Sequence, residues 1–188
     1  MNNSRASVIG IGRLGLCFSL TLENGGYSVV GCDVRTDYVN SINDQTFFSH
    51  EPGVNERLSI VKNLEATTDM KQAVAFSDVI FVTVASYSEP DGRYDVSQVE
   101  SVVDQLIDMG TQNAKKHLVI CTNVNPGYSD TVYERLKKYN WNVSFNPEII
   151  AQGTILINQA IPDCVYIGSD SEEIANEIVQ IYNNICEN

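Results

Sequence analysis

Three glycines at a fixed spacing near the amino end constrain this chain more than any other feature. Gly10 lies near the end of the apolar run of residues 6–11, Gly12 and Gly15 follow that run, and an amphipathic stretch begins behind them. A strand that ends in a glycine turn and leads straight into a helix is typical of the start of a unit whose strands lie parallel. The turn therefore predicts an α/β fold built on a parallel sheet.

Each glycine of this turn has its own steric reason. Gly10 lets the chain turn sharply out of the strand, Gly12 lets the backbone approach a pyrophosphate, and Gly15 lets the helix lie close to the sheet. The helix that starts near Arg13 and Leu14 directs unpaired NH groups and the positive end of its dipole at the phosphates. The pattern predicts that a dinucleotide binds at this turn.

One carboxylate indicates which dinucleotide to expect. Asp33 ends the second apolar run, residues 28–33, and lies 18 residues beyond Gly15. At that place it can accept both hydroxyls of an adenosine ribose and would repel a 2'-phosphate, so NAD is favoured over NADP. Arg35 points the other way, because a cation two residues further on could accommodate that phosphate.

Composition argues against several classes of partner. A chain of 188 residues has the length of one domain, and a hydrophobic content of 43% is enough for a sizeable core. The formal net charge of −12 argues against nucleic acid and anionic membranes, which are bound mainly through clustered Lys and Arg. No run approaches the roughly 18 apolar residues of a membrane span. The cysteine spacing predicts reduced thiols and no metal site, so we expect a cytoplasmic protein.

Short β-branched runs alternate with longer helical patterns almost to the end of the chain. The expected strands are residues 6–11, 28–33, 64–67, 78–84, 117–121, 142–145 and 164–168. The expected helices are residues 13–24, 35–44, 53–61, 69–76, 95–110, 127–139 and 171–185. This alternation predicts a Rossmann-like, doubly wound, mostly parallel sheet with helices on both faces. Ligands of such sheets bind at the carboxyl ends of the strands.

The strand-end loops together resemble the amino-terminal domain of the UDP-glucose and GDP-mannose 6-dehydrogenase family. The matching segments follow the family's order across nearly the whole chain: the glycine turn, Gly31-Cys-Asp33-Val34, His50-Glu-Pro-Gly53, Thr67-Thr-Asp69, residues 77–84, Asp95-Val96, Asn125-Pro-Gly127, Asn146-Pro-Glu148, Gly153-Thr154 and Ile167-Gly168. The resemblance implies a nucleotide-sugar dehydrogenase that oxidises the sugar C6 alcohol to a carboxylate in two hydride transfers to NAD. Synthesis of polysaccharide precursors is implied with it.

The resemblance also assigns coenzyme contacts residue by residue. Matches to the coenzyme-binding positions are Gly10, Gly12, Arg13, Leu14 and Gly15 at the pyrophosphate, Asp33 at the ribose, Val84 and Ser86 in the loop under the adenosine and nicotinamide ribose, and Thr122 at the start of the family's Ser-Thr-Val segment. The family has Arg or Lys five residues after the ribose acid, where this chain has Tyr38. Arg35 is expected to substitute for that cation.

The catalytic part of the pattern contains departures from the family. Glu148 matches the first glutamate of the Asn-Pro-Glu motif, which serves acid–base steps. Asn123 replaces a threonine that positions a water or hydroxyl, Val84-Ala-Ser-Tyr87 replaces Val-Pro-Thr-Pro, and Gln152 replaces a second glutamate. Glutamine keeps its hydrogen bonds but cannot take a proton. A positioned acid–base group contributes roughly 10²–10⁴-fold in rate, so we expect impaired hydrolysis or a divergent substrate step.

The resemblance places the family's cysteine nucleophile, with a lysine and an asparagine, in a helical linker and a carboxyl-terminal sugar-nucleotide domain. None of the five cysteines here matches it. We therefore expect residues 1–188 to form a single NAD-binding domain that does not turn over alone and that reaches its nucleotide sugar through a second domain. The sequence leaves the oligomeric state of this domain undecided. Two alternatives are a non-catalytic dinucleotide-binding or regulatory module, and another NAD-dependent dehydrogenase of the hydroxyacid type.

Overall fold

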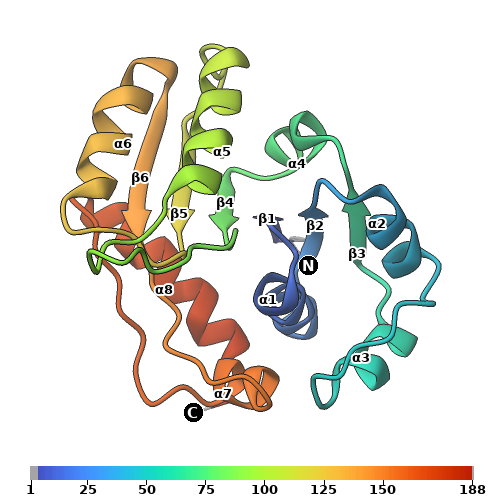
Figure 1. Ribbon diagram of the computed structural model, residues 1–188. Coiled ribbons are helices and arrows are strands. Elements are labelled where there is room, and N and C mark those ends of the chain that lie inside the picture. Colours follow the sequence, from blue (N-terminus) through green and yellow to red (C-terminus); the bar gives the residue numbers. More distant parts are fainter. Residues whose placement is uncertain (1–3, 188) are drawn as a thin grey trace.

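The runs rich in valine and isoleucine form a six-stranded sheet in which every pair of neighbours is parallel. The computed structural model describes residues 4–187. Its strands are β1 (Arg5–Ile9), β2 (Ser28–Cys32), β3 (Leu64–Thr67), β4 (Val79–Val82), β5 (Lys116–Ile120) and β6 (Trp141–Phe145). Their order is β3-β2-β1-β4-β5-β6 (Figure 1). The predicted doubly wound α/β fold is confirmed.

The helices connect these strands. They are α1 (Arg13–Asn24), α2 (Thr36–Asn43), α3 (Val54–Ile60), α4 (Met70–Phe76), α5 (Ser97–Asp108), α6 (Tyr128–Leu136), α7 (Ile155–Ala160) and α8 (Glu172–Ile185). Most predicted boundaries agree to within one or two residues, which is the usual uncertainty at a helix end. The exception is the helix expected over 127–139, because its last turn tightens into the 3-10 turn Lys137–Tyr139.

Between β6 and α8 one sequence-based assignment is wrong and one helix was missed. The strand expected at 164–168 is reduced to a single antiparallel bridge between Phe145 and Gly168. One reason is that the side chain of Asn146 donates to the Tyr166 carbonyl at 2.8 Å, so that carbonyl is not free to extend a ladder. Helix α7 was not predicted at all. It is only six residues long, and its first turn is held by a residue from a distant part of the chain.

Alternating residues of the strands build a core on each face of the sheet. On one face, side chains such as Val8 and Phe81 pack with α1, α2, α3, α7 and α8. On the other face, Ile9 and Ile80 pack with α4, α5 and α6. Figure 1 shows α5 and α6 standing together beside β5 and β6, with α8 running behind these strands toward α1.

The last helix completes the core on the α1 side. Ile174, Ile178, Ile181 and Ile185 of α8 are all buried. The Asn184 amide donates to the Tyr27 hydroxyl at 3.0 Å, which joins the end of α8 to the start of β2. None of the helices within residues 4–187 combines the length and apolarity needed to cross a bilayer.

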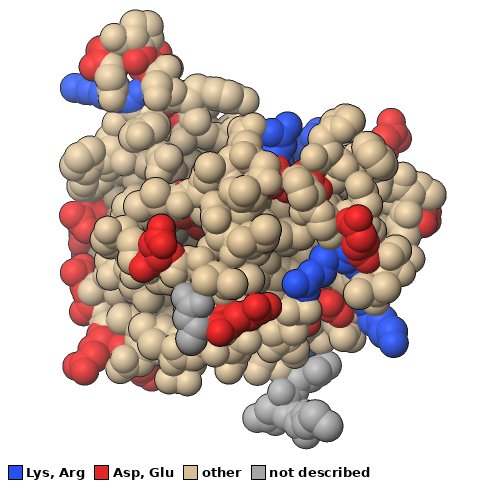
Figure 2. All heavy atoms as spheres, turned by 90° about the horizontal axis from the view of Figure 1, so that it is seen from below, with Lys and Arg blue, Asp and Glu red and all other residues tan. Residues whose placement is uncertain are grey.

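The surface reflects the acidic composition. Figure 2, seen from below, shows acidic side chains along one edge of the molecule and a few scattered lysines and arginines elsewhere. A binding face for nucleic acid would instead carry clustered lysines and arginines.

Candidate functional site

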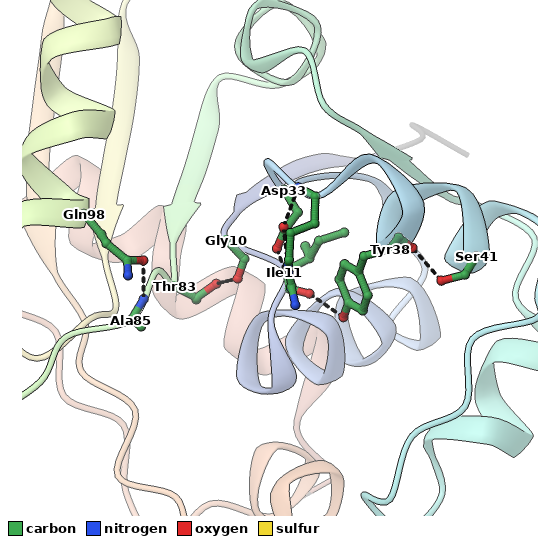
Figure 3. Close-up of polar contacts among 9 residues, drawn as sticks. Gly10, Ile11, Asp33, Tyr38, Ser41, Thr83, Ala85 and Gln98 are labelled. Atoms are coloured by element: carbon green, nitrogen blue, oxygen red, sulfur yellow. Dashed lines mark hydrogen bonds and ion pairs between the residues drawn. The ribbon is translucent and has the colours of Figure 1, made fainter.

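The point where the sheet changes direction defines the site. The chain leaves β1 toward β2 and β3, then crosses back to place β4 on the other side of β1, and ligands bind in the crevice outside such a switch point. The NH of Thr83 donates to the Ile9 carbonyl at 2.8 Å and its hydroxyl donates to the Gly10 carbonyl at 2.8 Å (Figure 3). The glycine turn after β1 is therefore fixed against the end of β4.

The glycines of the turn answer two different demands. Gly10 has a φ of +91°, and a Cβ there would lie 2.7 Å from the backbone nitrogen of Val84. A Cβ on Gly15 would overlap the Gly10 carbonyl oxygen and the Thr83 hydroxyl. A Cβ on Gly12 would meet nothing within 4 Å. The fold itself thus requires Gly10 and Gly15, whereas at Gly12 the missing side chain leaves open space in front of the turn.

The acid after β2 lies beside this turn and is paired. Asp33 is 9% exposed, and its carboxylate accepts hydrogen bonds from Arg35 Nε at 2.8 Å and Nη2 at 2.9 Å. The guanidinium lies 4.0 Å above the ring of Tyr38, whose hydroxyl donates to the Ile11 carbonyl at 2.7 Å (Figure 3). The hydrogen bonds that the guanidinium donates to Asp33 hold the pKa of Arg35 above its ordinary value.

The loops after β4 and β5 meet on the side of the glycine turn opposite to Asp33. The Thr122 hydroxyl donates to the Val84 carbonyl at 2.7 Å. Gln98 of α5 accepts a hydrogen bond from the NH of Ala85 at 3.2 Å (Figure 3). Val84 and Thr122 are therefore brought together as the strand-end rule predicts, with Ser86 half-buried in the same loop. Gln98, which supports this loop, was not identified from the sequence.

Glu148 is a buried carboxyl group. Its Oε2 accepts a hydrogen bond from the Gln159 amide at 2.8 Å, while its Oε1 is buried without a hydrogen-bond partner among the described residues. Burial raises the pKa of Glu148 to about 7. The residue lines a cavity of about 200 Å³ together with Asn146 and Tyr182. A carboxyl group of this kind can hold or release a proton near neutral pH.

The pKa values of the neighbouring thiols are raised as well. Burial, followed by the charges of Glu51 and Glu148, raises the pKa of Cys17 to about 12. Burial and then Glu148 raise the pKa of Cys121 well above its ordinary value. Since the thiolate is the nucleophile, neither group is activated. In residues 4–187 no cluster of three or more His, Cys, Asp or Glu is arranged to hold a metal ion.

The two residues that depart from the family lie in different surroundings. Gln152 accepts a hydrogen bond from the Arg13 guanidinium, which links the segment before α7 to the start of α1. Asn123 is exposed in the loop after β5. Gln152 is thus joined to the glycine turn, whereas no comparable contact holds Asn123 among residues 4–187.

Glu51 is a structural residue that the sequence alone did not identify as such. Its buried carboxylate accepts hydrogen bonds from the NH groups of Gly153 at 2.9 Å and Ile155 at 2.8 Å. These donors belong to the start of α7, about a hundred residues away in sequence. The Glu-Pro-Gly turn therefore holds the segment that carries Glu148 and Gln152. No local pattern reveals such a distant contact.

We expect Glu51→Gln to loosen this segment without unfolding the protein. The amide keeps one acceptor but loses the charge that strengthens both hydrogen bonds, each of the charge-assisted kind worth about 1.5–3 kcal/mol. Hydrogen exchange measured by mass spectrometry should become faster over residues 150–160, with a loss of about 1–2 kcal/mol in local opening free energy. Equal exchange in the two proteins would contradict this role. Glu56→Gln, at an exposed position of α3, is the control.

The strand order and the glycine turn after β1 define a dinucleotide-binding domain of the Rossmann type. Residues 4–186 match the UDP-glucose/GDP-mannose dehydrogenase family, NAD binding domain, and the chain belongs to this family. NAD is accordingly the coenzyme of the domain. The resemblance inferred from the strand-end loops is thereby confirmed.

Known relatives match nearly the whole length of the chain. It is 28% identical to the GDP-mannose 6-dehydrogenase of Pseudomonas aeruginosa over 193 residues, with 96% of this chain and 44% of the relative covered. It is 31% identical to the UDP-N-acetyl-D-mannosamine dehydrogenase of Methanococcus maripaludis, with 96% and 42% covered. A crystal structure of a ternary complex of GDP-mannose dehydrogenase from Pseudomonas aeruginosa superposes with a TM-score of 0.86 at 26% identity, with 95% and 44% covered. The chain spans less than half the length of these relatives.

Proposed function

We propose that residues 1–188 form the NAD-binding domain of a nucleotide-sugar 6-dehydrogenase, which oxidises the sugar C6 alcohol to a carboxylate. The observation that carries this proposal is that one chain of this family contains both the glycine turn and Glu148. Glu148 is a buried carboxyl group whose pKa is raised to about 7. A second domain would supply the sugar site and the thiol nucleophile. The substrate class follows the relatives, which act on UDP- and GDP-sugars by name.

The residues around the glycine turn fit NAD. The open space in front of Gly12 admits a pyrophosphate, and the amino end of α1 directs NH groups toward that space. Asp33 lies at the end of β2, where it can bind the adenosine ribose. Arg13 and Leu14 begin the helix, and Val84, Ser86 and Thr122 form the opposite wall. When bound, NAD supplies the hydride acceptor.

Glu148 is the acid–base group in this proposal. Its unpartnered Oε1 is the atom at which a proton would be held or taken up, and the Gln159 amide fixes the orientation of the carboxyl group through Oε2. Because its pKa is close to 7, both protonation states are populated at neutral pH, as acid–base catalysis requires. Asn123 and Gln152 would act only through hydrogen bonds.

A second candidate function is a non-catalytic dinucleotide-binding or regulatory module. The observation that favours it is the contact of Gln152 with Arg13. This position, which holds a glutamate in the family, cannot exchange a proton here and is engaged with the glycine turn. Coenzyme binding would then persist without oxidation of a sugar.

Production of NADH separates the two functions. We expect purified residues 1–188 to give no steady-state absorbance change at 340 nm with NAD and UDP-glucose, UDP-N-acetylmannosamine or GDP-mannose. The natural gene product that contains these residues at full length should oxidise one of these sugars. In that protein Glu148→Gln should lower kcat by roughly 10²–10⁴-fold, while Glu56→Gln should not.

Turnover by residues 1–188 alone would contradict the proposal that a second domain supplies the sugar site and the thiol nucleophile. A full-length protein that binds NAD but oxidises none of these sugars would support the regulatory module.

A further inference from the structure

The carboxylate of Asp33 is already occupied by protein groups. Oδ1 accepts from Arg35 Nε at 2.8 Å and from the Arg35 backbone NH at 3.1 Å, and Oδ2 accepts from Nη2 at 2.9 Å. A carboxylate offers about four acceptor positions, so the pair leaves about one of them on Oδ2. An adenosine ribose brings two hydroxyl donors. Asp33 cannot receive both while the complete ion pair persists.

Arg35 is able to release this acid. Its side chain is 56% exposed, against 8% for Asp33, so the guanidinium can move into solvent while the carboxylate stays in place. The ring of Tyr38 lies under the guanidinium at 4.0 Å and is fixed by its hydroxyl to Ile11. The residue that must move is therefore the arginine, and its contacts with Asp33 and Tyr38 oppose that movement.

The ion pair also changes how the site responds to a 2'-phosphate. An unpaired Asp33 would repel the phosphate, but the paired carboxylate and guanidinium have no net charge together. A guanidinium carries five NH donors, and the two side-chain contacts with Asp33 leave three of them. An arginine with free donors next to the ribose acid is the kind of group that accommodates a 2'-phosphate.

We propose that Arg35 is the specificity-determining residue of the coenzyme site. Its guanidinium competes with the NAD ribose for Asp33, and it lets the site tolerate a 2'-phosphorylated dinucleotide. This inference rests on the coenzyme site described under the proposed function and deepens it. NAD binds by displacing the guanidinium from Asp33, whereas NADP binds with the guanidinium kept beside the acid and turned in part to the phosphate. The chain therefore discriminates between the two coenzymes less strongly than Asp33 alone would.

Calorimetric titration of residues 1–188 with NAD and with NADP tests this proposal. Arg35→Gln should lower the Kd for NAD by about 2- to 10-fold, since the cost of opening an exposed ion pair is removed. It should raise the Kd for NADP by about tenfold or more, because a charge-assisted phosphate contact is lost. Arg35→Lys, which keeps the charge without the two-pronged geometry, should give intermediate values.

A double-mutant cycle shows whether Arg35 acts through Asp33. In an Asp33→Asn background the gain in NAD affinity from Arg35→Gln should disappear, because the carboxylate for which Arg35 and the NAD ribose compete is gone. Arg57→Gln removes the same charge from α3 and should change neither Kd by more than about twofold.

Two results would overturn the proposal: NAD binding to folded Arg35→Gln that is unchanged or weaker, or an unchanged ratio of the two Kd values. Failure of the wild-type domain to bind NAD would overturn the coenzyme site itself. Absence of sugar oxidation would leave this inference intact, since both readouts are binding constants.

Discussion

Replacing Gly12 with alanine should abolish tight NAD binding while the fold remains intact. A Cβ at this position meets no protein atom within 4 Å, and the backbone angles of φ −64° and ψ −157° are open to alanine. The methyl group would instead occupy the space through which the pyrophosphate approaches the amino end of α1. Losing one or two charge-assisted hydrogen bonds of about 1.5–3 kcal/mol each corresponds to a Kd raised by about 100-fold.

Gly15→Ala is the matched comparison within the same turn. Its Cβ would overlap the Gly10 carbonyl and the Thr83 hydroxyl. These two groups are hydrogen-bonded to each other where β1 and β4 pair in the sheet. We expect a loss of about 3 kcal/mol or more in the free energy of unfolding, since overpacking typically costs about 1–3 kcal/mol and backbone cannot yield easily. Urea unfolding and calorimetry on both variants check the pair. Equal melting of Gly15→Ala and wild type, or normal NAD affinity of Gly12→Ala, would contradict the assignment.

The second large effect concerns the buried carboxyl group of Glu148. Burial raises its pKa from 4.5 to about 7, so between these values the folded state binds more protons than the unfolded state. Stability from this group is therefore full below about pH 4.5 and is lost as the pH rises to 7. At 1.36 kcal/mol per pKa unit the loss amounts to about 3 kcal/mol. Glu148→Gln, which cannot ionise, should remove this slope and unfold at higher urea than wild type at pH 8.

The difference between the two proteins isolates Glu148 from other groups. Burial also raises the pKa of Glu177, which adds to the same slope, and lowers the pKa of His117 to about 4, which gives a slope of opposite sign. Both contributions are common to wild type and variant and cancel in the difference. Urea midpoints measured from pH 5 to 8 should diverge with rising pH. Parallel curves would show that Glu148 ionises freely in the folded protein.

The local patterns of the sequence were sufficient for most of the fold. These patterns are the glycine turn, the acid at the end of the second strand and the helical spacing of isoleucines in α8. Each involves residues within about 20 positions of one another, so each is visible in the order of residues. The region 146–168 was not predictable in this way. Helix α7 depends on Glu51, and the expected strand at 164–168 is prevented in part by the Asn146 side chain.

The site shows the same division. The strand-end rule correctly grouped Gly10, Asp33, Val84 and Thr122, because parallel strands end at one edge. The contact of Gln159 with Glu148 arises from the packing of α7 and leaves no signal in the spacing. The ion pair of Asp33 with Arg35 lies between these cases: both residues were named, but only the geometry shows that both carboxylate oxygens are engaged.

The isoleucine stripe of α8 determines how far this domain can be shortened. A version ending after β6 would retain the glycine turn and the ribose acid, but it would expose the apolar layer that α8 covers and lose the anchor between Asn184 and Tyr27. Such a fragment would be prone to self-association through the uncovered layer. Expression and proteolysis studies should therefore treat α8 as part of the smallest unit that folds independently.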